Sequence, residues 1–117
     1  MTNEITQENT TDFYCDFVLN GKIEVKKVME TANVLAYHHT RPFWPVHIVV
    51  VPKQHISSLL APEIEEPAIV MEMLSVIRQV AHRVTTEHGA CCILTNLGEY
   101  QDSKHLHWHV TYGKPLR

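Results

Sequence analysis

The chain lacks an excess of positive charge. Its 117 residues carry 10 Lys and Arg against 13 Asp and Glu, so the net charge is −3 with neutral histidines and the pI is about 6.3. Proteins that hold a nucleic-acid backbone do so largely through Lys and Arg, which neutralise phosphates. The composition therefore argues against nucleic acid as a partner.

Cysteine is scarce, and long apolar runs are missing. The three cysteines, Cys15, Cys91 and Cys92, are odd in number and two are adjacent, which favours a reducing, cytoplasmic setting over a disulfide framework. No stretch approaches the roughly 18 apolar residues of a membrane span, and the first residues lack the pattern of a signal peptide. We therefore expect a cytoplasmic protein that does not use a membrane as a partner.

The rest of the composition is that of a globular chain. Hydrophobic residues make up 44% of the sequence, and neither internal repeats nor low-complexity segments are present. The length fits one domain of roughly 100 to 150 residues. Residues 1–11 are polar, with Ile5 as the single bulky apolar residue after the initial Met, so we predict a flexible tail followed by one domain over residues 12–117.

Strand-forming residues and turn signals dominate the order of the elements. We predict a short helix over 12–21, a hairpin over 23–39 with its turn at 31–33, and strands over 46–51, 91–95 and 105–112. Together with one long helix, this order indicates an α+β fold: an antiparallel sheet of about five strands with one long and one short helix.

Apolar residues recur every three or four positions between Ile64 and Val84, which predicts the long helix with one face buried. An interior Pro67 would block a hydrogen bond, so the helix begins near Glu65 or has a distorted first turn, and Gly89 ends it. The face predicted to be buried consists of Ile64, Ala68, Met71, Leu74, Ile77, Ala81 and Val84.

Nine histidines are the compositional anomaly, and three of them alternate in the last strand. The period of two places His105, His107 and His109 on one face and apolar residues on the other. In a metal site, two of these imidazoles would act with His47 or His55, because His105 and His109 are about 13 Å apart along a strand. In a nucleophilic site, His107 attacks phosphorus while its neighbours hold its tautomer and protonate the leaving group.

The hexamer of residues 105–110 resembles the motif of the histidine triad (HIT) superfamily, in which His and apolar residues alternate along a strand. The resemblance extends upstream and to the loop before the hexamer. It is carried there by Val34-Leu35-Ala36-Tyr37, Pro42, Pro45-Val46-His47, Val51-Pro52-Lys53-Gln54-His55-Ile56, and Asn96-x-Gly98 with Gln101.

This resemblance implies a homodimer whose sheets join across the interface and whose clefts bind a small-molecule nucleotide, with chemistry at the α-phosphorus and no cofactor. His107 would be the nucleophile, oriented by a bond from its ring N–H to backbone near His105. His105 and His109 would support the phosphate and the leaving group, with His47 as a fourth histidine. Asn96 and Gln101 would donate hydrogen bonds to the phosphate.

The chain departs from the family pattern at three places. Where most members carry an acid that holds the ribose hydroxyls, this chain has His39, which we predict to contact substrate in its place. Asp102 replaces the Ser or Thr before the first triad histidine, and a carboxylate there repels a phosphate unless Ser103 or Lys104 takes over. The zinc-binding Cys-x-x-Cys of some members is reduced to Cys15, so we predict no bound metal.

We expect an enzyme that hydrolyses a nucleoside phosphoramidate, a nucleotidyl ester or a dinucleoside polyphosphate through a covalent nucleotidyl group on His107. Two alternatives stay open. One is a sensor that binds a nucleotide or metabolite without turnover, and the other is a metal-dependent enzyme that uses the histidine strand.

Overall fold

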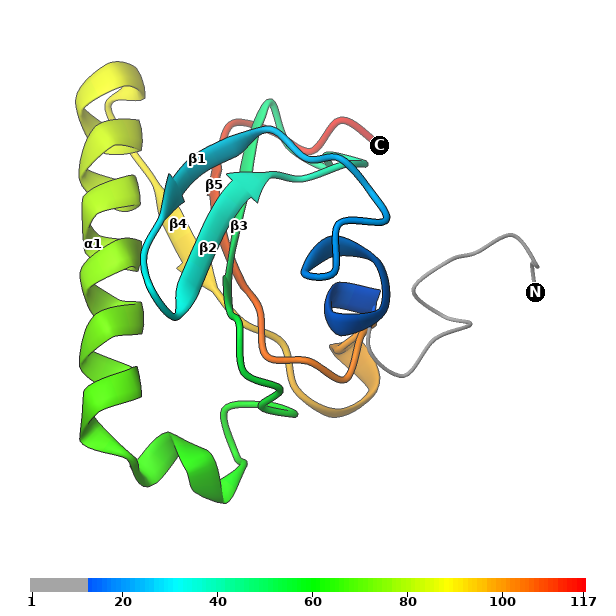
Figure 1. Cartoon of the computed structure of the whole chain (residues 1–117). Coiled ribbons are helices and arrows are strands. Elements are labelled where there is room, and N and C mark those ends of the chain that lie inside the picture. The colour runs from blue at the N-terminus through cyan, green and yellow to red at the C-terminus, as the bar shows by residue number, and fades with distance from the viewer. Residues whose placement is uncertain (1–12) are drawn as a thin grey trace.

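Residues 13–117 are described by a computed structural model, and the tail predicted for residues 1–11 lies outside them. The five strands form one antiparallel sheet in the order β1-β2-β3-β5-β4, with the long helix α1 against one face (Figure 1). This arrangement confirms the predicted α+β class. The bounds of the strands are β1 Lys27–Glu30, β2 Val34–His38, β3 Val46–Pro52, β4 Cys92–Leu94 and β5 Trp108–Tyr112, and α1 spans Pro67–His88.

The two faces of the sheet follow from alternation in β2 and β3. One set of side chains, which includes Val34, Ala36 and Val50, packs in the core beneath α1. The other set, Leu35, Tyr37, Val49 and Val51, packs beneath Phe13, Tyr14 and Val18 from the N-terminal segment. Because β-branched side chains fit a pleated surface buried on both sides, this Val-rich sequence favours central strands.

The long helix begins three residues later than its apolar pattern indicates. Pro67 is its first residue, where a missing N–H costs nothing, so the helix begins two residues after Glu65, near which its start was predicted. Pro62 begins a separate 3-10 turn, Pro62–Glu65. Gly89 ends α1 as expected, with φ of +92° and its N–H donating to the Thr85 carbonyl. No helix in the described part of the chain is long and apolar enough to cross a membrane.

The face of α1 that contacts the sheet is also rotated from the prediction. Ile77 and Val84 are buried as expected, but Met71 is 65% exposed and Leu74 is 48% exposed in the single chain. The buried stripe consists of Ile69, Met73, Val76, Ile77, Val80 and Val84. The helix therefore carries a second apolar stripe, and one copy of the chain leaves that stripe uncovered.

The predicted short helix is a single π-helical turn, η2, over Tyr14–Val18. Its wide turn is closed by the Leu19 N–H, which donates to the Tyr14 carbonyl at 2.7 Å. The start of the turn is held by Ser103, whose hydroxyl accepts a hydrogen bond from the Phe13 N–H at 3.0 Å. In Figure 1 this blue turn lies on the opposite side of the sheet from α1. The histidine-bearing face of the sheet thus lies beneath η2.

Candidate active site: a histidine cluster beneath the N-terminal turn

Only the last of the three alternating histidines lies in a strand. The strand predicted over 105–112 begins at Trp108, so His105 and His107 precede β5. The reason is that β3 ends at Pro52, and the Leu106 N–H donates instead to the Ile56 carbonyl outside the sheet. The alternation of side chains persists, because Leu106 is buried in the core under α1 while both histidine rings lie against Tyr14.

His107 has the geometry that its predicted role requires. The ring is 4% exposed, and its Nδ1 lies 2.7 Å from the carbonyl oxygen of His105. A carbonyl can only accept, so Nδ1 is the donor, and the neutral ring carries its lone pair on Nε2. The tautomer with a nucleophilic Nε2 is therefore selected by the backbone of the residue two positions earlier.

His47 and His109 form a relay with a defined direction. The Phe43 backbone N–H donates to Nδ1 of His47 at 3.0 Å, so the proton of a neutral His47 is on Nε2. That Nε2 lies 2.8 Å from Nδ1 of His109 and donates to it. The proton of His109 is therefore on its own Nε2. The ring of His109 lies 5.0 Å from that of His107 between centroids, so the donor lies close to the nucleophile.

Burial keeps both relay histidines neutral. Desolvation, followed by the neighbouring His39 and His107, lowers the pKa of His47 to about 3. Desolvation and then His107 and His47 lower the pKa of His109 to about 3 as well. Both rings therefore hold one proton each near pH 7, which is the state the relay needs.

His105 is held on both ring nitrogens. Its Nε2 donates to the Pro52 carbonyl at 2.7 Å, and its Nδ1 lies 3.5 Å from the thiol sulfur of Cys15. With His55, these residues place three potential metal ligands within 4.8 Å of one another. Cys and His suit zinc, but a structural zinc site uses four ligands, and the described residues supply three. The prediction of no bound metal stays a prediction.

The loop residues predicted to bind phosphate are instead tied into the fold in this state. Gln101 donates through Nε2 to the Ser57 carbonyl at 2.7 Å, and the fully buried Ser103 accepts from Phe13. Asn96 is half-buried, one residue after Thr95, whose hydroxyl donates to the His107 carbonyl at 2.8 Å. Roles for Asn96, Gln101 and Ser103 at the phosphate stay predictions, which would use the second amide N–H of Gln101 and the hydroxyl proton of Ser103.

His39 extends the histidine cluster beyond the triad. Its ring stacks on His47 with centroids 4.3 Å apart and an interplanar angle of 27°, and it lies 6.2 Å from His109. The Arg41 N–H donates to its Nδ1 at 2.9 Å, so the neutral ring presents a donor at Nε2. Desolvation and then His107, Arg117 and Arg41 lower its pKa to about 4.

Comparison with known proteins identifies the domain that carries this cluster. Residues 20–115 match the model of the HIT domain. The chain belongs to the HIT family. A HIT-like protein of Azospirillum brasilense is 35% identical over 106 residues, which is 85% of this chain and 84% of that protein. The structure of a histidine triad protein from Clostridium difficile shares 33% identity and a TM-score of 0.75, over all of this chain and 97% of that one. A HIT family hydrolase from Legionella pneumophila has the same fold, with a TM-score of 0.76, 22% identity and coverage of 91% and 96%.

Tyr14 is the residue of this HIT site that sequence reasoning missed. Its buried ring lies 4.9 Å from His107 and 5.6 Å from His105, so it covers the triad from η2. It also contacts Tyr37, and desolvation followed by Tyr14 raises the pKa of Tyr37 well above its usual range. An aromatic residue in a short apolar segment carries no local signal for this contact, since the partners are about 90 positions away in the chain.

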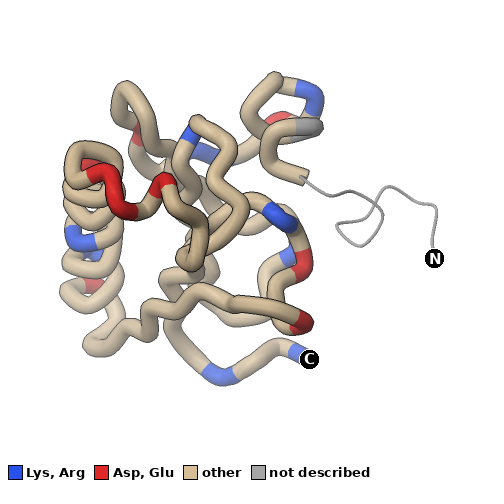
Figure 2. Tube along the Cα trace, turned by 90° about the horizontal axis from the view of Figure 1, so that it is seen from below, with Lys and Arg blue, Asp and Glu red and all other residues tan. Residues whose placement is uncertain are grey.

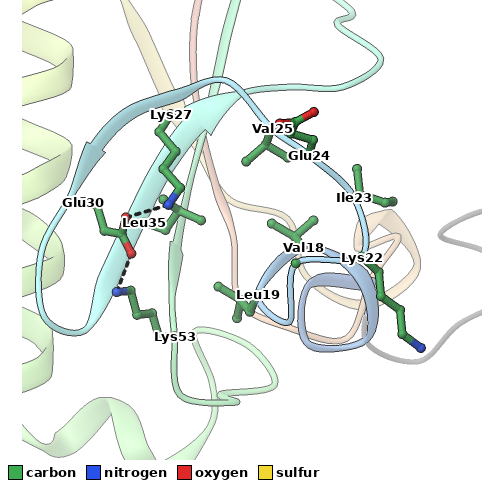
Figure 3. Close-up of a pocket in the computed structure, with 11 residues that line it drawn as sticks. Val18, Leu19, Lys22, Ile23, Glu24, Val25, Lys27, Glu30, Leu35 and Lys53 are labelled. Carbon is green, nitrogen blue, oxygen red and sulfur yellow. Dashed lines mark hydrogen bonds and ion pairs between the residues drawn. The ribbon is translucent and has the colours of Figure 1, made fainter.

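A separate cavity of about 780 Å³ opens on the other side of η2, between this turn and the β1 edge of the sheet (Figure 3). Its apolar wall includes Val18 and Leu35, and its charged wall is an ion-paired group in which Glu30 contacts Lys27 at 2.9 Å and Lys53 at 2.6 Å. None of the predicted site residues of the HIT domain lines it. The histidine cluster therefore lies on a different part of this face.

Proposed function

We propose that this HIT protein is a nucleotide hydrolase or transferase that acts at the α-phosphorus through a covalent nucleotidyl group on His107. The observation that carries the proposal is the bond between Nδ1 of His107 and the His105 carbonyl, because it leaves the lone pair on Nε2. The relay from Phe43 through His47 to His109 supports it, since it sets a proton donor beside that nucleophile.

The reaction balances in two steps. In the first, Nε2 of His107 forms a bond to the α-phosphorus while the bond to the leaving amine or oxygen breaks; the Nε2–H of neutral His109 donates a hydrogen bond to that leaving group, which takes its proton from solvent water. In the second, water attacks the phosphorus, the bond to His107 breaks, and the proton released by the water neutralises the hydroxide left in the first step. The products are a nucleoside monophosphate and the protonated leaving group. Asn96, Gln101 and Ser103 are the proposed phosphate contacts, and His39 contacts the substrate beyond them.

The proposed active form is a homodimer. Three apolar side chains exposed in the single chain lie on α1 and the edge strand β4, namely Met71, Leu74 and Ile93. Leu74 and Ile93 border a groove of about 1110 Å³ that runs along α1. Because β4 is at the end of the sheet order, a second copy can cover the groove and extend the sheet.

The first experiment is turnover of adenosine and guanosine 5′-phosphoramidates and dinucleoside polyphosphates. We expect the wild type to release the mononucleotide and His107→Ala to lose on the order of 10⁴-fold in kcat. His109→Ala loses less, about 10²- to 10³-fold, because His109 donates a hydrogen bond to the leaving group and does not form the covalent bond. His88→Ala, which replaces an exposed histidine at the end of α1 outside this groove, is the matched control and keeps full activity.

Intact-mass measurement of the stopped reaction should show a nucleotidyl adduct on the wild type and none on His107→Ala. Turnover that survives His107→Ala would show that the nucleophile is assigned wrongly. Binding of nucleotides without turnover by either protein would favour a sensor.

Metal-dependent hydrolysis is a second candidate, and the cluster of Cys15, His55 and His105 is the observation that favours it. A covalent histidine mechanism does not need this cluster to carry an ion. We therefore expect turnover to persist in a chelator and in Cys15→Ser. Stoichiometric zinc in the purified protein together with loss of turnover on chelation would reverse the order of the two candidates.

A further inference from the structure

Positive charge collects at one edge of the histidine cluster. After desolvation and His107, the charges of Arg117 and Arg41 lower the pKa of His39, and Arg117 also contributes to the lowered pKa of His47. An arginine lowers the pKa of a neighbouring histidine because its fixed positive charge disfavours the imidazolium form. This edge therefore has an electrostatic preference for an anion.

The C-terminal segment holds one of these arginines in place. The Leu116 N–H donates to the Phe43 carbonyl at 2.8 Å, and Nη2 of Arg117 donates to the Arg41 carbonyl at 3.3 Å. The Arg117 guanidinium also lies 5.7 Å above the ring of Phe43. Figure 2 shows basic residues, in blue, at and near the labelled C-terminal end of the chain. The last residues thus bring a guanidinium to the segment that leads from His39 to His47.

His39 adds a directed donor to this charge. Its Nδ1 is occupied by the Arg41 N–H, so a neutral ring can donate only through Nε2. Two guanidinium groups and one imidazole donor are a suitable set for a phosphate or a carboxylate. They are poorly suited to hold a ribose diol, which is bound best by an acceptor of two hydroxyl protons.

We propose that His39, Arg41 and Arg117 form an anion subsite, and that the preferred substrate carries a second anionic group in addition to the reacting phosphate. This inference rests on the proposed function and narrows its substrate class. Two sources present the same chemistry: a 2′- or 3′-phosphate on the ribose of the nucleotide, and a carboxylate on the leaving group. The stack of His39 on His47 places the subsite directly beside the relay, so a single ligand can span both.

The test compares ligands that differ only in the second anion. The first arm is calorimetric binding of AMP and of adenosine 2′,5′- and 3′,5′-bisphosphates. The second arm is kcat/KM for adenosine 5′-phosphoramidates of alaninamide and of aspartate. We expect at least one ligand with the second anion to be preferred by about tenfold or more, as a charged hydrogen bond contributes, and the preference to shrink at high salt.

Variants assign this preference to its residues. Arg41→Gln and Arg117→Gln should each reduce the preference toward one, because each weakens binding of the doubly anionic ligand by more than it weakens binding of AMP. Lys114→Gln removes the same charge from the same exposed tail, but Lys114 does not act on His39 or His47, so it should keep the preference. His39→Asp should raise the affinity for AMP and lower the affinity for the doubly anionic ligand.

The outcomes separate this inference from the function on which it rests. AMP binding and turnover without any preference for a second anion would overturn the subsite and leave the hydrolase proposal in place. A preference that survives both arginine substitutions would also overturn it. Absence of both nucleotide binding and turnover would overturn both proposals.

Discussion

At the scale of single residues, substitutions of the relay histidine His47 can show whether it positions His109 or only packs against it. Its Nε2 proton fixes the tautomer of His109, so His47→Ala should lower kcat by about 10²-fold, less than His107→Ala. In His47→Gln the side-chain amide can donate in place of Nε2, and we expect this variant to recover most of the rate. Stopped-flow or steady-state kcat, with Tm measured alongside, checks both variants. Equal losses for Ala and Gln would show that His47 acts through packing alone.

The buried histidines also make stability depend on pH. The pKa is about 3 for His47 and His109 and about 4 for His39 in the fold, against an ordinary value near 6.5. Between these values the unfolded chain binds more protons, so the stability contributed by neutral rings is complete above pH 6.5 and is lost as pH falls toward 3. We expect Tm to fall steadily from pH 6.5 to pH 4.5.

Urea or thermal unfolding at half-unit steps of pH measures this slope. The lowered pKa of Glu30, about 2, acts in the same direction only near the acid end of this range, because the unfolded carboxyl has an ordinary pKa of 4.5 and is half protonated at pH 4.5; the slope between pH 6.5 and pH 5.5 therefore reports the histidines. His82→Asn removes an exposed histidine and should leave the slope unchanged. A Tm that is constant between pH 6.5 and 4.5 would contradict the neutral, buried state of the cluster.

The same residues show which features of the site can be predicted from the sequence. The alternation of His105, His107 and His109 predicted one shared face, and the resemblance to HIT proteins predicted the bond from His107 to backbone near His105, which the structure contains. The tautomer of His109 could not be predicted from the sequence. It is set by the Phe43 N–H, which fixes the tautomer of His47, and by the hydrogen bond from His47 to His109 across 62 positions of the chain. Such bonds follow from the tertiary fold, and no local spacing encodes them.

At the scale of elements, Gly113 fixes the turn that leads from β5 into the C-terminal segment. Its φ is +99°, and a Cβ there would lie 2.7 Å from a ring carbon of Pro45. Gly113→Ala therefore combines backbone strain with a clash that a rigid ring cannot relieve. Gly89→Ala, at a φ of +92° with open space around it, has the strain alone.

We expect Gly113→Ala to be destabilised by more than the roughly 1 kcal/mol that strain alone costs Gly89→Ala. Urea unfolding of both variants gives the comparison. Because the turn also aligns Arg117 with Arg41, Gly113→Ala should weaken the preference for a second anion as well. Equal stability of the two variants would show that Pro45 moves aside.

The apolar periodicity predicted the helix and the strands better than it predicted which of their faces are buried and where they end. It found the hairpin, the central strand β3 and the helix α1, because each has a strong and regular apolar pattern. It could not tell that α1 has two apolar stripes, since Met71 and Leu74 have the same spacing as a core face. It also extended β5 to His105, because alternation continues where the strand partner has already ended at Pro52.

At the scale of the whole molecule, the site joins segments that are far apart in the chain. Tyr14 in η2 lies against His107, and His47 in β3 bonds to His109 in β5. The sheet holds these partners rigidly, and its opposite face lies on α1. The helix therefore takes no direct part in the histidine cluster, which leaves its second apolar stripe available for a different role.

The whole-molecule prediction is that this stripe and the β4 edge form the homodimer interface. Leu74 and Ile93 are 48% and 45% exposed in the single chain, and both border the groove along α1. Burial of such side chains against a second copy contributes about 1.5–3 kcal/mol each, so a charge in their place should prevent association. Light scattering after size-exclusion chromatography should give a dimer for the wild type and a monomer for Leu74→Glu and Ile93→Lys.

Leu60→Glu is the control for this prediction. Leu60 is 77% exposed, more than either interface residue, but it lies outside α1 and β4 and does not line the groove, so its variant should stay dimeric. If all three variants behaved alike, the stripe would not be the interface. Because the histidines and η2 lie on the other face of the sheet, a monomeric Leu74→Glu that keeps its fold should still form the adduct on His107. Loss of that adduct in the folded monomer would mean that the second copy contributes to the cleft itself.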